Sequence, residues 1–285
     1  MKNVKSCSWV AENLNKVSVF DAGIVKPGMA GPYKPCAVVR GAGRFDISDA
    51  LSDPKTQLSN MMCNAKQFQS HMRQLGVNQN DTVVLYDDSG LFSAARGWWM
   101  LKNMGFEHVF IMDGGLPEWL LHGFPVQQQH STPNSMGNFT VIQGADGWQF
   151  IERYEVLRAI LDESSLLLDA RSPLRFSGCE QEPRTGMRSG HIPNSKNLYY
   201  NVLLTERGLL RSIGELQALF RLLGCEGKAL QFSCGSGVTA CILALAADEC
   251  GYTKLGVYDG SWNEWGSMQF CNELPIRCES GSNLK

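Results

Sequence analysis

The sequence predicts an α/β protein made of two tandem copies of one fold, each a mainly parallel sheet with helices on both faces. The chain has 285 residues, enough for about two domains. Its 44% hydrophobic and 19% charged residues are an ordinary globular composition. Two observations support the prediction: a segment of the first half recurs in the second half, and short apolar runs alternate with amphipathic stretches.

The repeat has a constant spacing of 146 residues over its best-matched part. The pairs at this spacing are Gly105 and Gly251, Asp113 and Asp259, and Trp119 and Trp265. The same spacing places Cys234 opposite Asp88. Upstream, Asp21 matches Asp169 at a spacing of 148, as expected where loops differ in length. We therefore expect two copies of about 125–145 residues each.

The boundary between the copies is expected where the chain becomes polar and rich in turn residues. Residues 124–138 have this composition and include Gln127-Gln-Gln-His-Ser-Thr-Pro-Asn-Ser. We expect a first domain over 1–124, a linker over 125–138 and a second domain over 139–285.

The second copy shows the element pattern most clearly. Three apolar runs predict buried strands, at Leu166–Asp169, Leu230–Ser233 and Leu255–Tyr258. Three stretches with apolar residues at helical spacing predict helices, at Ile151–Leu161, Gly214–Leu223 and Val238–Cys250. Short strands separated by helices imply a parallel sheet buried on both faces. Active sites of such sheets lie beyond the carboxyl ends of the strands, which is where Cys234 falls.

The charge balance and the apolar runs give no sign of a nucleic-acid or membrane partner. The formal net charge is -2. Glu12, Asn13 and Asn15 interrupt the apolar stretch that a secretory signal would need. The best apolar run, Val238 to Ala247, is far shorter than the ~20 residues that span a bilayer. We expect a cytoplasmic protein.

Ten cysteines are present, but their spacing argues against a disulfide scaffold or a zinc site. No CxxC or CxxxC pair occurs. We expect no bound metal, and we expect most of the cysteines to be small buried apolar residues.

Cys234 is the exception, because it follows a strand and opens a glycine-rich loop that leads into a helix. Gly235 and Gly237 allow successive backbone N–H groups to turn inward and form a cradle for an anion. The positive end of the following helix adds to this effect. Such a cradle favours the ionised thiolate and any anionic adduct on its sulfur. A buried structural cysteine is the commoner case in general, but this position favours a reactive one.

Phosphatases that use a similar loop need an arginine six residues after the cysteine, where its planar fork grips a phosphate. That position is Ala240 here. Phosphatase activity is therefore disfavoured.

Four motifs together resemble the tandem-domain rhodanese family. They are Cys234-Gly-Ser-Gly-Val-Thr-Ala, the two turns that end in Glu118-Trp and Glu264-Trp, the run Glu182-Pro-Arg-Thr-Gly-Met-Arg-Ser-Gly-His-Ile-Pro, and Leu91-Phe-Ser-Ala-Ala-Arg-Gly-Trp-Trp-Met. The resemblance covers almost the whole chain and is weakest over roughly residues 26–64. It implies that the second domain is catalytic and that the first is an inactive copy.

The resemblance also implies a reaction. Members similar to this chain move sulfur from 3-mercaptopyruvate through a cysteine persulfide, here on Cys234, to a thiol or cyanide acceptor, without a metal or organic cofactor. A thioredoxin-like protein is one candidate acceptor. Members that prefer thiosulfate carry cations beside the cysteine, whereas Gly235 and Ser236 provide none. A thiosulfate:cyanide sulfurtransferase and a non-catalytic persulfide carrier remain the alternatives.

Residue roles follow from the same resemblance. Gly235, Gly237, Val238 and Thr239 form the cradle, and Arg175 and Arg184 clamp the carboxylate and keto group of the substrate; Arg188 is a weaker third candidate. Without the motif, these arginines would be interpreted as solvated surface residues. Ser236 either hydrogen-bonds the leaving group or relays a proton, or it only stabilises the loop. Asp46 belongs to a proton relay whose usual histidine is replaced by Asn60, and an amide cannot exchange a proton near neutral pH.

Overall fold

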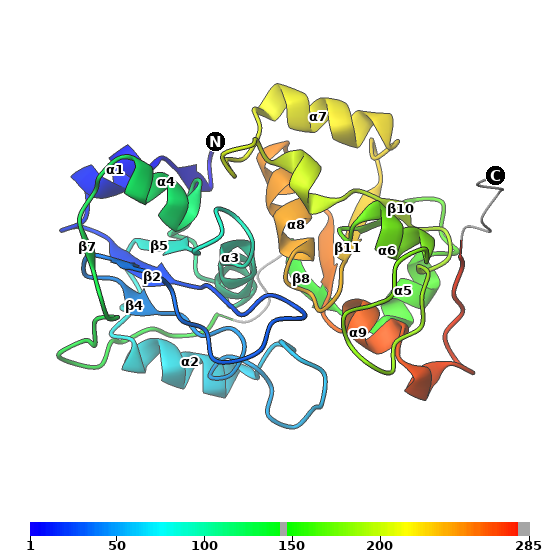
Figure 1. The fold of residues 1–285 in the computed structure, drawn as a ribbon, viewed down its shortest axis with the longest axis horizontal. Coiled ribbons are helices and arrows are strands. Elements are labelled where there is room, and N and C mark those ends of the chain that lie inside the picture. Colours follow the sequence, from blue (N-terminus) through cyan, green and yellow to red (C-terminus); the bar gives the residue numbers. More distant parts are fainter. Residues whose placement is uncertain (143–146, 279–285) are drawn as a thin grey trace.

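The first domain is a five-stranded parallel sheet with helices on both faces (Figure 1). The computed structural model describes residues 1–142 and 147–278. The strand order is β1 (Val4–Lys5), β6 (Val109–Met112), β5 (Val83–Tyr86), β2 (Ser18–Asp21) and β4 (Gly43–Arg44). Helices α1 (Cys7–Glu12) and α4 (Gly115–Leu121) pack on one face. Helices α2 (Ala65–Gln74) and α3 (Ala94–Asn103) cover the other face.

The second domain repeats this architecture. Its parallel sheet has the order β10 (Lys196–Asn197), β9 (Ser165–Asp169), β11 (Ala229–Ser233), β12 (Leu255–Tyr258) and β8 (Trp148–Ile151). Helices α5 (Arg153–Ala159) and α9 (Ser261–Trp265) lie on one face, and α7 (Ile213–Leu222) and α8 (Ala240–Glu249) lie on the other. The remaining short elements are α6 (Pro173–Ser177), η1 (Tyr200–Leu203), η2 (Met268–Phe270) and the antiparallel pair β3 (Val38–Val39) and β7 (Val126–Gln127).

The predicted α/β class and the two parallel sheets are confirmed, and the three predicted strands of the second copy match within one residue. The helix expected over Ile151–Leu161 begins only at Arg153, because Ile151 pairs with Tyr258 as the last residue of the unpredicted strand β8. The helix expected from Val238 begins at Ala240, because the residues before it form the loop after Cys234.

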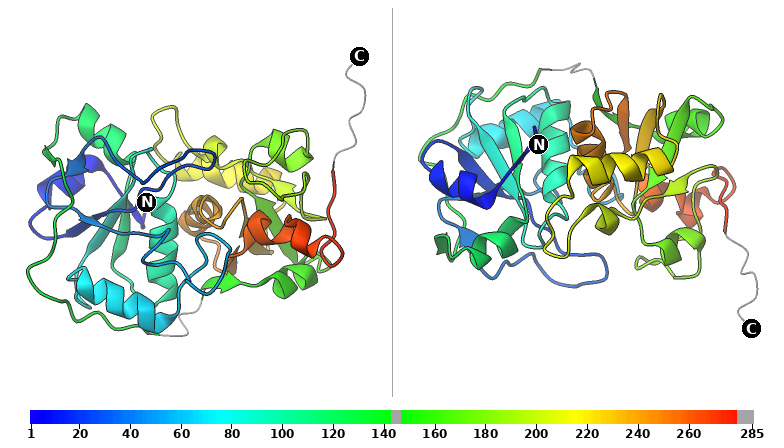
Figure 2. Two further views of the ribbon diagram at one scale, coloured as in Figure 1. Left: turned by 60° about the horizontal axis from the view of Figure 1, so that its bottom comes forward. Right: turned by 90° about the horizontal axis from the view of Figure 1, so that it is seen from above.

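The two domains share one apolar core. Helices α3 and α8 pack against each other between the sheets (Figures 1 and 2). A single cluster of buried residues extends from Phe20 and Leu85 to Leu230 and Phe232. At the N-terminus, the backbone N–H groups of Lys2 and Asn3 donate to Glu249 of the second domain, at 2.8 and 2.6 Å. This interface fixes the position of one domain relative to the other.

The segment expected to be the linker lies on the first domain. β7 pairs with β3, the N–H of Ser131 donates to the carbonyl of Ala42 at 2.8 Å, and the N–H of Gly137 donates to the carbonyl of Arg73 at 2.8 Å. Phe139, expected at the start of the second domain, is fully buried against aromatic rings of the first domain. The end of the expected second domain, residues 279–285, lies outside the described residues.

Sheet register corrects the repeat alignment by one residue. Val109 and Leu255 are equivalent at the spacing of 146, yet they pair with Val83 and Leu230, respectively. Likewise, the carbonyl of Asp87 accepts the N–H of Leu116, and the carbonyl of Cys234 accepts the N–H of Trp262. The counterpart of Cys234 is therefore Asp87 and not Asp88. The loop after β5 is one residue longer than the loop after β11, which the constant spacing conceals.

No helix in the part of the chain that the structure describes is long and apolar enough to cross a membrane.

Candidate active site

A cavity of about 1020 Å³ lies between the domains and contains most of the predicted site residues. Its lining includes Asp46, Asn60, Arg175, Arg184, Cys234, Gly235, Ser236, Val238 and Thr239. Residues 24–33 of the first domain form much of the opposite wall. A second cavity, of about 860 Å³, contains none of the predicted site residues. The site is thus assembled from both domains.

Cys234 directly follows β11 and faces the cavity. Its exposed fraction is only 2%, but it is a lining residue of the cavity, so a small molecule can reach it there. The turn into α9 holds its backbone: the N–H of Cys234 donates to Ser261 Oγ at 3.2 Å, and its carbonyl accepts the N–H of Trp262 at 3.0 Å. The N–H of Asn263 donates to the carbonyl of Gly235 at 2.8 Å.

The loop after Cys234 offers unused backbone donors. Within the described residues, the N–H groups of residues 235–240 donate to no protein acceptor. Gly237 has φ +72°, the left-handed conformation that glycine adopts without strain. Backbone donors gathered between a strand and a helix N-terminus suit an anion.

The first domain shows such an anion in place. Asp87, the counterpart of Cys234, accepts four backbone N–H groups of its own loop. Ser89 donates to Oδ1 at 2.9 Å, and Phe92, Ser93 and Ala94 donate to Oδ2 at 2.8–2.9 Å. A loop of this type therefore holds a negative charge at the position that Cys234 occupies in the second domain.

The two predicted clamp arginines lie directly over the loop. A Cβ atom on Gly235 would be 3.3 Å from Arg175 Nη2 and 3.5 Å from Arg184 Nη1, so this glycine leaves room for both guanidinium groups. Arg184 Nη2 donates to Ser236 Oγ at 3.3 Å. Burial lowers the pKa of Arg184. No carboxylate in the described ranges forms an ion pair with Arg184, so its charge is available to a substrate anion.

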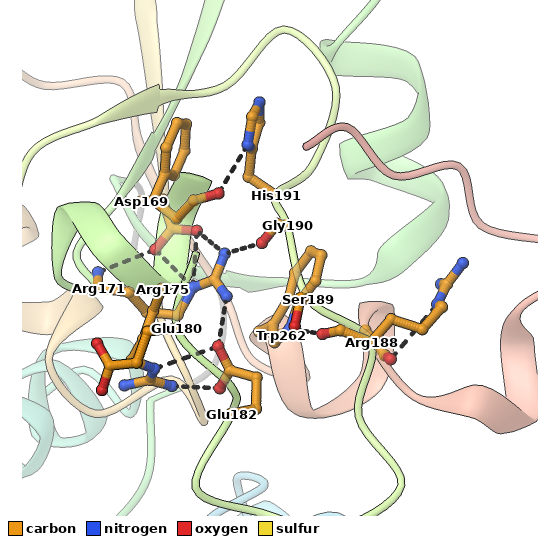
Figure 3. Close-up of polar contacts among 12 residues, drawn as sticks. Asp169, Arg171, Arg175, Glu180, Glu182, Arg188, Ser189, Gly190, His191 and Trp262 are labelled. Carbon is orange, nitrogen blue, oxygen red and sulfur yellow. Dashed lines mark hydrogen bonds and ion pairs between the residues drawn. The ribbon is translucent and has the colours of Figure 1, made fainter. Parts of the chain in front are cut away.

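Arg175 differs because a carboxylate already holds it (Figure 3). Its Nε and Nη2 donate to the two oxygens of Glu182, at 3.2 and 2.5 Å. Arg171 Nη1 donates to the same carboxylate at 2.8 Å, and Asp169 in turn binds Arg171. With 18% of its side chain exposed, Arg175 is not a solvated surface residue. Glu182 orients it and compensates part of its charge.

Arg188, the weaker third candidate, lies elsewhere (Figure 3). Its guanidinium donates to the carbonyls of Trp265 and Leu274, at 2.6 and 2.9 Å, and it does not line the cavity. It ties the C-terminal segment to α9 and is not a clamp.

Ser236 accepts two hydrogen bonds. Asn60 Nδ2 donates to its Oγ at 3.1 Å, in addition to Arg184. A hydroxyl oxygen has two lone pairs, so both are used and the hydroxyl hydrogen is free to donate into the cavity. Asn60 is buried, with φ +64°, and its side-chain amide is a hydrogen-bond donor to Ser236.

Asp46 lines the cavity but does not contact Ser236 or Asn60. Its Oδ1 accepts the N–H groups of Ser48 and Asp49, at 3.1 and 3.3 Å, and lies 3.6 Å from Arg44 Nη2. Its carboxylate therefore stabilises its own loop. The structure brings Ser236 and Asn60 together and leaves Asp46 apart from them.

Sequence reasoning missed two buried charges beneath the loop, Arg96 and Asp259. Their Nη2 and Oδ1 atoms are 2.7 Å apart across the domain interface. A usable signal was present, because Arg96 stands in an otherwise apolar helix, Ala94-Ala-Arg-Gly-Trp-Trp-Met, where a charge requires a partner.

The ten cysteines are all free thiols within the described residues. Only five are buried, namely Cys7, Cys63, Cys225, Cys234 and Cys241. The expectation that most are buried was therefore too strong, since four lie on exposed loops or tails. Burial raises the pKa of Cys7, Cys63, Cys225 and Cys241, to about 11 for Cys225.

Comparison with known proteins agrees with this geometry. The rhodanese-like domain model matches residues 45–122 and 153–268. The 3-mercaptopyruvate sulfurtransferase of Escherichia coli K12 is 36% identical over 94% of this chain and 95% of its own length. A mitochondrial thiosulfate/3-mercaptopyruvate sulfurtransferase of Arabidopsis thaliana is 33% identical over 98% of this chain and 79% of its own length.

A solved structure has a similar fold over most of the chain. The crystal structure of a 3-mercaptopyruvate sulfotransferase from Escherichia coli superposes with a TM-score of 0.82 at 32% identity, covering 93% of this chain and all of that one. The two parallel five-stranded sheets match two tandem rhodanese domains, a fold of sulfur-transferring enzymes. The chain belongs to the rhodanese family, and it is a sulfurtransferase with two tandem rhodanese domains.

Proposed function

We propose that this sulfurtransferase takes sulfur from 3-mercaptopyruvate on Cys234 and passes it to a thiol or to cyanide. The observation that supports this donor most is the position of the charges. The loop residues 235–239 include no cation, and the free guanidinium of Arg184 lies over Gly235. A donor whose carboxylate is remote from its sulfur matches this arrangement better than thiosulfate, a compact dianion.

The first half-reaction is a displacement at sulfur. The Cys234 thiolate forms a bond to the sulfur of 3-mercaptopyruvate, the carbon–sulfur bond breaks, and its electron pair remains on carbon as the enolate of pyruvate. Arg184 and Arg175 bind the carboxylate and keto oxygen, and the free hydrogen of Ser236 donates to the developing enolate oxygen. A proton then adds to the enolate carbon to give pyruvate.

The product on the enzyme is a persulfide, whose terminal sulfur is stabilised by the backbone donors of the cradle. In the second half-reaction, a thiolate or cyanide attacks that terminal sulfur and the Cys234 thiolate leaves. These steps require no metal or organic cofactor. A small thiol fits the cavity, and a thioredoxin-like protein is a further candidate acceptor.

Two alternatives predict different kinetics. The name of the Arabidopsis relative includes thiosulfate as well as 3-mercaptopyruvate. A thiosulfate-preferring enzyme would show the larger kcat/KM with thiosulfate. A persulfide carrier, which the isolated position of Asp46 keeps under consideration, would exchange one sulfur without turning over.

The test is a comparison of the two donors with cyanide as the common acceptor. We expect multiple turnovers and a kcat/KM for 3-mercaptopyruvate at least about tenfold above that for thiosulfate. A preference for thiosulfate, or a single exchange per molecule, would contradict the proposal.

A further inference from the structure

The first domain places one charged side chain beneath the catalytic loop. Arg96 is on α3, and it is fully buried at the interface with the second domain. Burying a guanidinium is costly unless its charge and its donors are matched. Its partners therefore show what it is positioned to do.

The guanidinium of Arg96 contacts groups of both domains. Nη2 forms the ion pair with Asp259 and donates to the carbonyl of Asn60 at 2.5 Å, and Nη1 donates to the carbonyl of Gly237 at 3.3 Å. The face of the guanidinium lies 4.2 Å from the centre of the Phe150 ring. Of the three guanidinium nitrogens of Arg96, only Nε has no hydrogen-bond partner among the described residues.

Two of these contacts, to the carbonyls of Asn60 and Gly237, hold the backbone on either side of the hydrogen bond between Asn60 and Ser236. Asn60 donates to Ser236, and Gly237 is the residue next to Ser236. Both backbones are in the left-handed region, with φ +64° at Asn60 and +72° at Gly237. A Cβ atom on Gly237 would lie 3.0 Å from Arg96 Nη1, so the loop is packed closely on the guanidinium.

The charge of Arg96 also reaches the thiols. Burial lowers the pKa of Arg96, but the Asp259 carboxylate outweighs burial and raises it. The arginine is therefore permanently charged beneath the cradle. The charged groups around the Cys234 loop are Arg96 from the first domain and Arg175 and Arg184 from the cavity. Asp259 balances the charge of Arg96, and Glu182 balances that of Arg175.

We propose that Arg96 is a positioning residue for sulfur transfer: from the non-catalytic domain it fixes the Asn60–Ser236 hydrogen bond and the loop at Gly237, and its charge favours anionic sulfur on Cys234. This inference rests on the proposed role of Cys234. It gives the first domain a function in the reaction, because Arg96 of this domain holds the loop that follows Cys234.

The experiment measures alkylation of Cys234 by iodoacetamide as a function of pH, by mass spectrometry of the peptide that contains this residue. Arg96→Met should raise the pH midpoint of alkylation by about one unit, because a nearby positive charge is lost. Asp259→Asn should lower the midpoint, because it leaves Arg96 uncompensated. A merely structural ion pair would make both variants change in the same direction.

Steady-state kinetics supply a second readout. Arg96→Met should lower kcat about tenfold or more and change KM for 3-mercaptopyruvate little, because Arg175 and Arg184 remain. Arg96→Lys should keep the wild-type midpoint and still lose kcat, because an ammonium keeps the charge but not the forked contacts. Arg73→Met is the matched control, since Arg73 donates to the carbonyl of Phe139 at 2.8 Å, outside the cavity.

The proposal is overturned if folded Arg96→Met and Asp259→Asn have the wild-type midpoint, or if both shift in the same direction. If Arg96→Met does not fold, two other results would overturn the proposal. One is a wild-type kcat in Arg96→Lys, and the other is an unchanged alkylation midpoint in Asp259→Asn. Alkylation needs no sulfur donor. If the wild type did not turn over 3-mercaptopyruvate, that result would contradict the proposed function. The alkylation midpoints of the wild type, Arg96→Met and Asp259→Asn would still test the role of Arg96.

Discussion

The loops after β5 and β11 are equivalent in the two domains, but they differ in whether a side chain accepts their backbone N–H groups. In the first domain, the carboxylate of Asp87 fills the cradle and accepts four backbone N–H groups. In the second domain, Cys234 is at the equivalent position, and the backbone donors of residues 235–240 have no acceptor among the described residues. The same fold thus stabilises itself with an internal anion in one copy, whereas in the other copy the corresponding donors of the described residues have no internal acceptor.

The two loops also differ in how accessible they are. Gly90 of the first-domain loop lies against Gly208, so that a Cβ on Gly90 would be 3.3 Å from the Cα of Gly208. The second-domain loop instead opens on the cavity, with Arg184 and Asn60 at its edge. A strand, loop and helix therefore do not suffice for chemistry. The cradle must also be vacant and accessible.

The largest effect is expected when the second loop is given the residue of the first. Cys234→Asp should abolish sulfur transfer, a loss of about a thousandfold or more, since no thiolate remains. Its carboxylate should occupy the cradle, so the melting temperature should not fall below that of Cys234→Ser. Turnover and thermal unfolding of both variants test this. A clearly less stable Cys234→Asp would show that the second loop does not accept an anion as the first does.

The reverse change should affect stability and not chemistry. Asp87→Ala leaves four backbone donors without their acceptor and should cost about 3 kcal/mol of unfolding free energy. Activity per folded molecule should remain near that of the wild type. Asp88→Ala is the control, because among residues 1–142 and 147–278 the carboxylate of Asp88 accepts a hydrogen bond only from Ser89 Oγ. Equal denaturant midpoints for the two variants would argue against the assignment of Asp87 as the counterpart of Cys234.

The free arginine should matter more than the paired one. Arg184→Ala should raise KM for 3-mercaptopyruvate by about tenfold to a hundredfold, and much less for thiosulfate, because a charge-assisted contact to the carboxylate is lost. Arg175→Ala should have a smaller effect in the same direction, and Arg188→Ala should have none. The comparison of donors decides: equal increases of KM for both donors would rule out the clamp.

A smaller effect concerns Asp113, the first-domain counterpart of Asp259. Burial raises the pKa of Asp113 to about 6, and it accepts the N–H of Leu210 at 2.9 Å, whereas Asp259 pairs with Arg96. A folded pKa above the ordinary value of 3.8 means that the folded state binds the proton more tightly, so this group loses stability as the pH rises from about 4 to about 6.

Asp113→Asn should remove that loss. Across this pH range the melting temperature of the wild type should decrease relative to the variant by about 5–10 °C. Parallel melting curves for wild type and variant at every pH would contradict the raised pKa.

The smallest effect is expected at Asn60. Because Ser236 has its hydroxyl hydrogen free to donate, Asn60→His should change kcat by less than about threefold. A rise of tenfold or more in steady-state kcat would instead show that proton transfer through position 60 limits the reaction and that this chain lacks it.

Much of the fold followed from local pattern. Apolar runs such as Leu230–Ser233 and Leu255–Tyr258 are strands because they are buried on both faces of a parallel sheet. Strand β8 escaped prediction because Trp148–Ile151 is partly exposed and runs directly into α5. The repeat was misplaced by one residue at Asp87, because a constant spacing cannot register a loop that is one residue longer.

The site was predictable where the chemistry is local and not where it depends on the domain interface. Cys234, Gly235 and Ser236 were predicted together from one loop and Arg184 from its motif, and these four residues line the same cavity. The contact of Arg96 with Asp259 joins the two domains. The apolar helix around Arg96 indicates that its charge needs a partner, but no local pattern indicates that the partner is Asp259. Asp46 was expected in a relay, but its carboxylate is held by the backbone of its own loop.

The central claim is that an open cradle at Cys234 holds the transferred sulfur, and mass spectrometry after treatment with 3-mercaptopyruvate tests it directly. We predict that the peptide containing this residue gains one sulfur atom, that cyanide removes it, and that Cys234→Ser gains none. An added sulfur on any of the other cysteines instead, or one that persists in Cys234→Ser, would contradict the account.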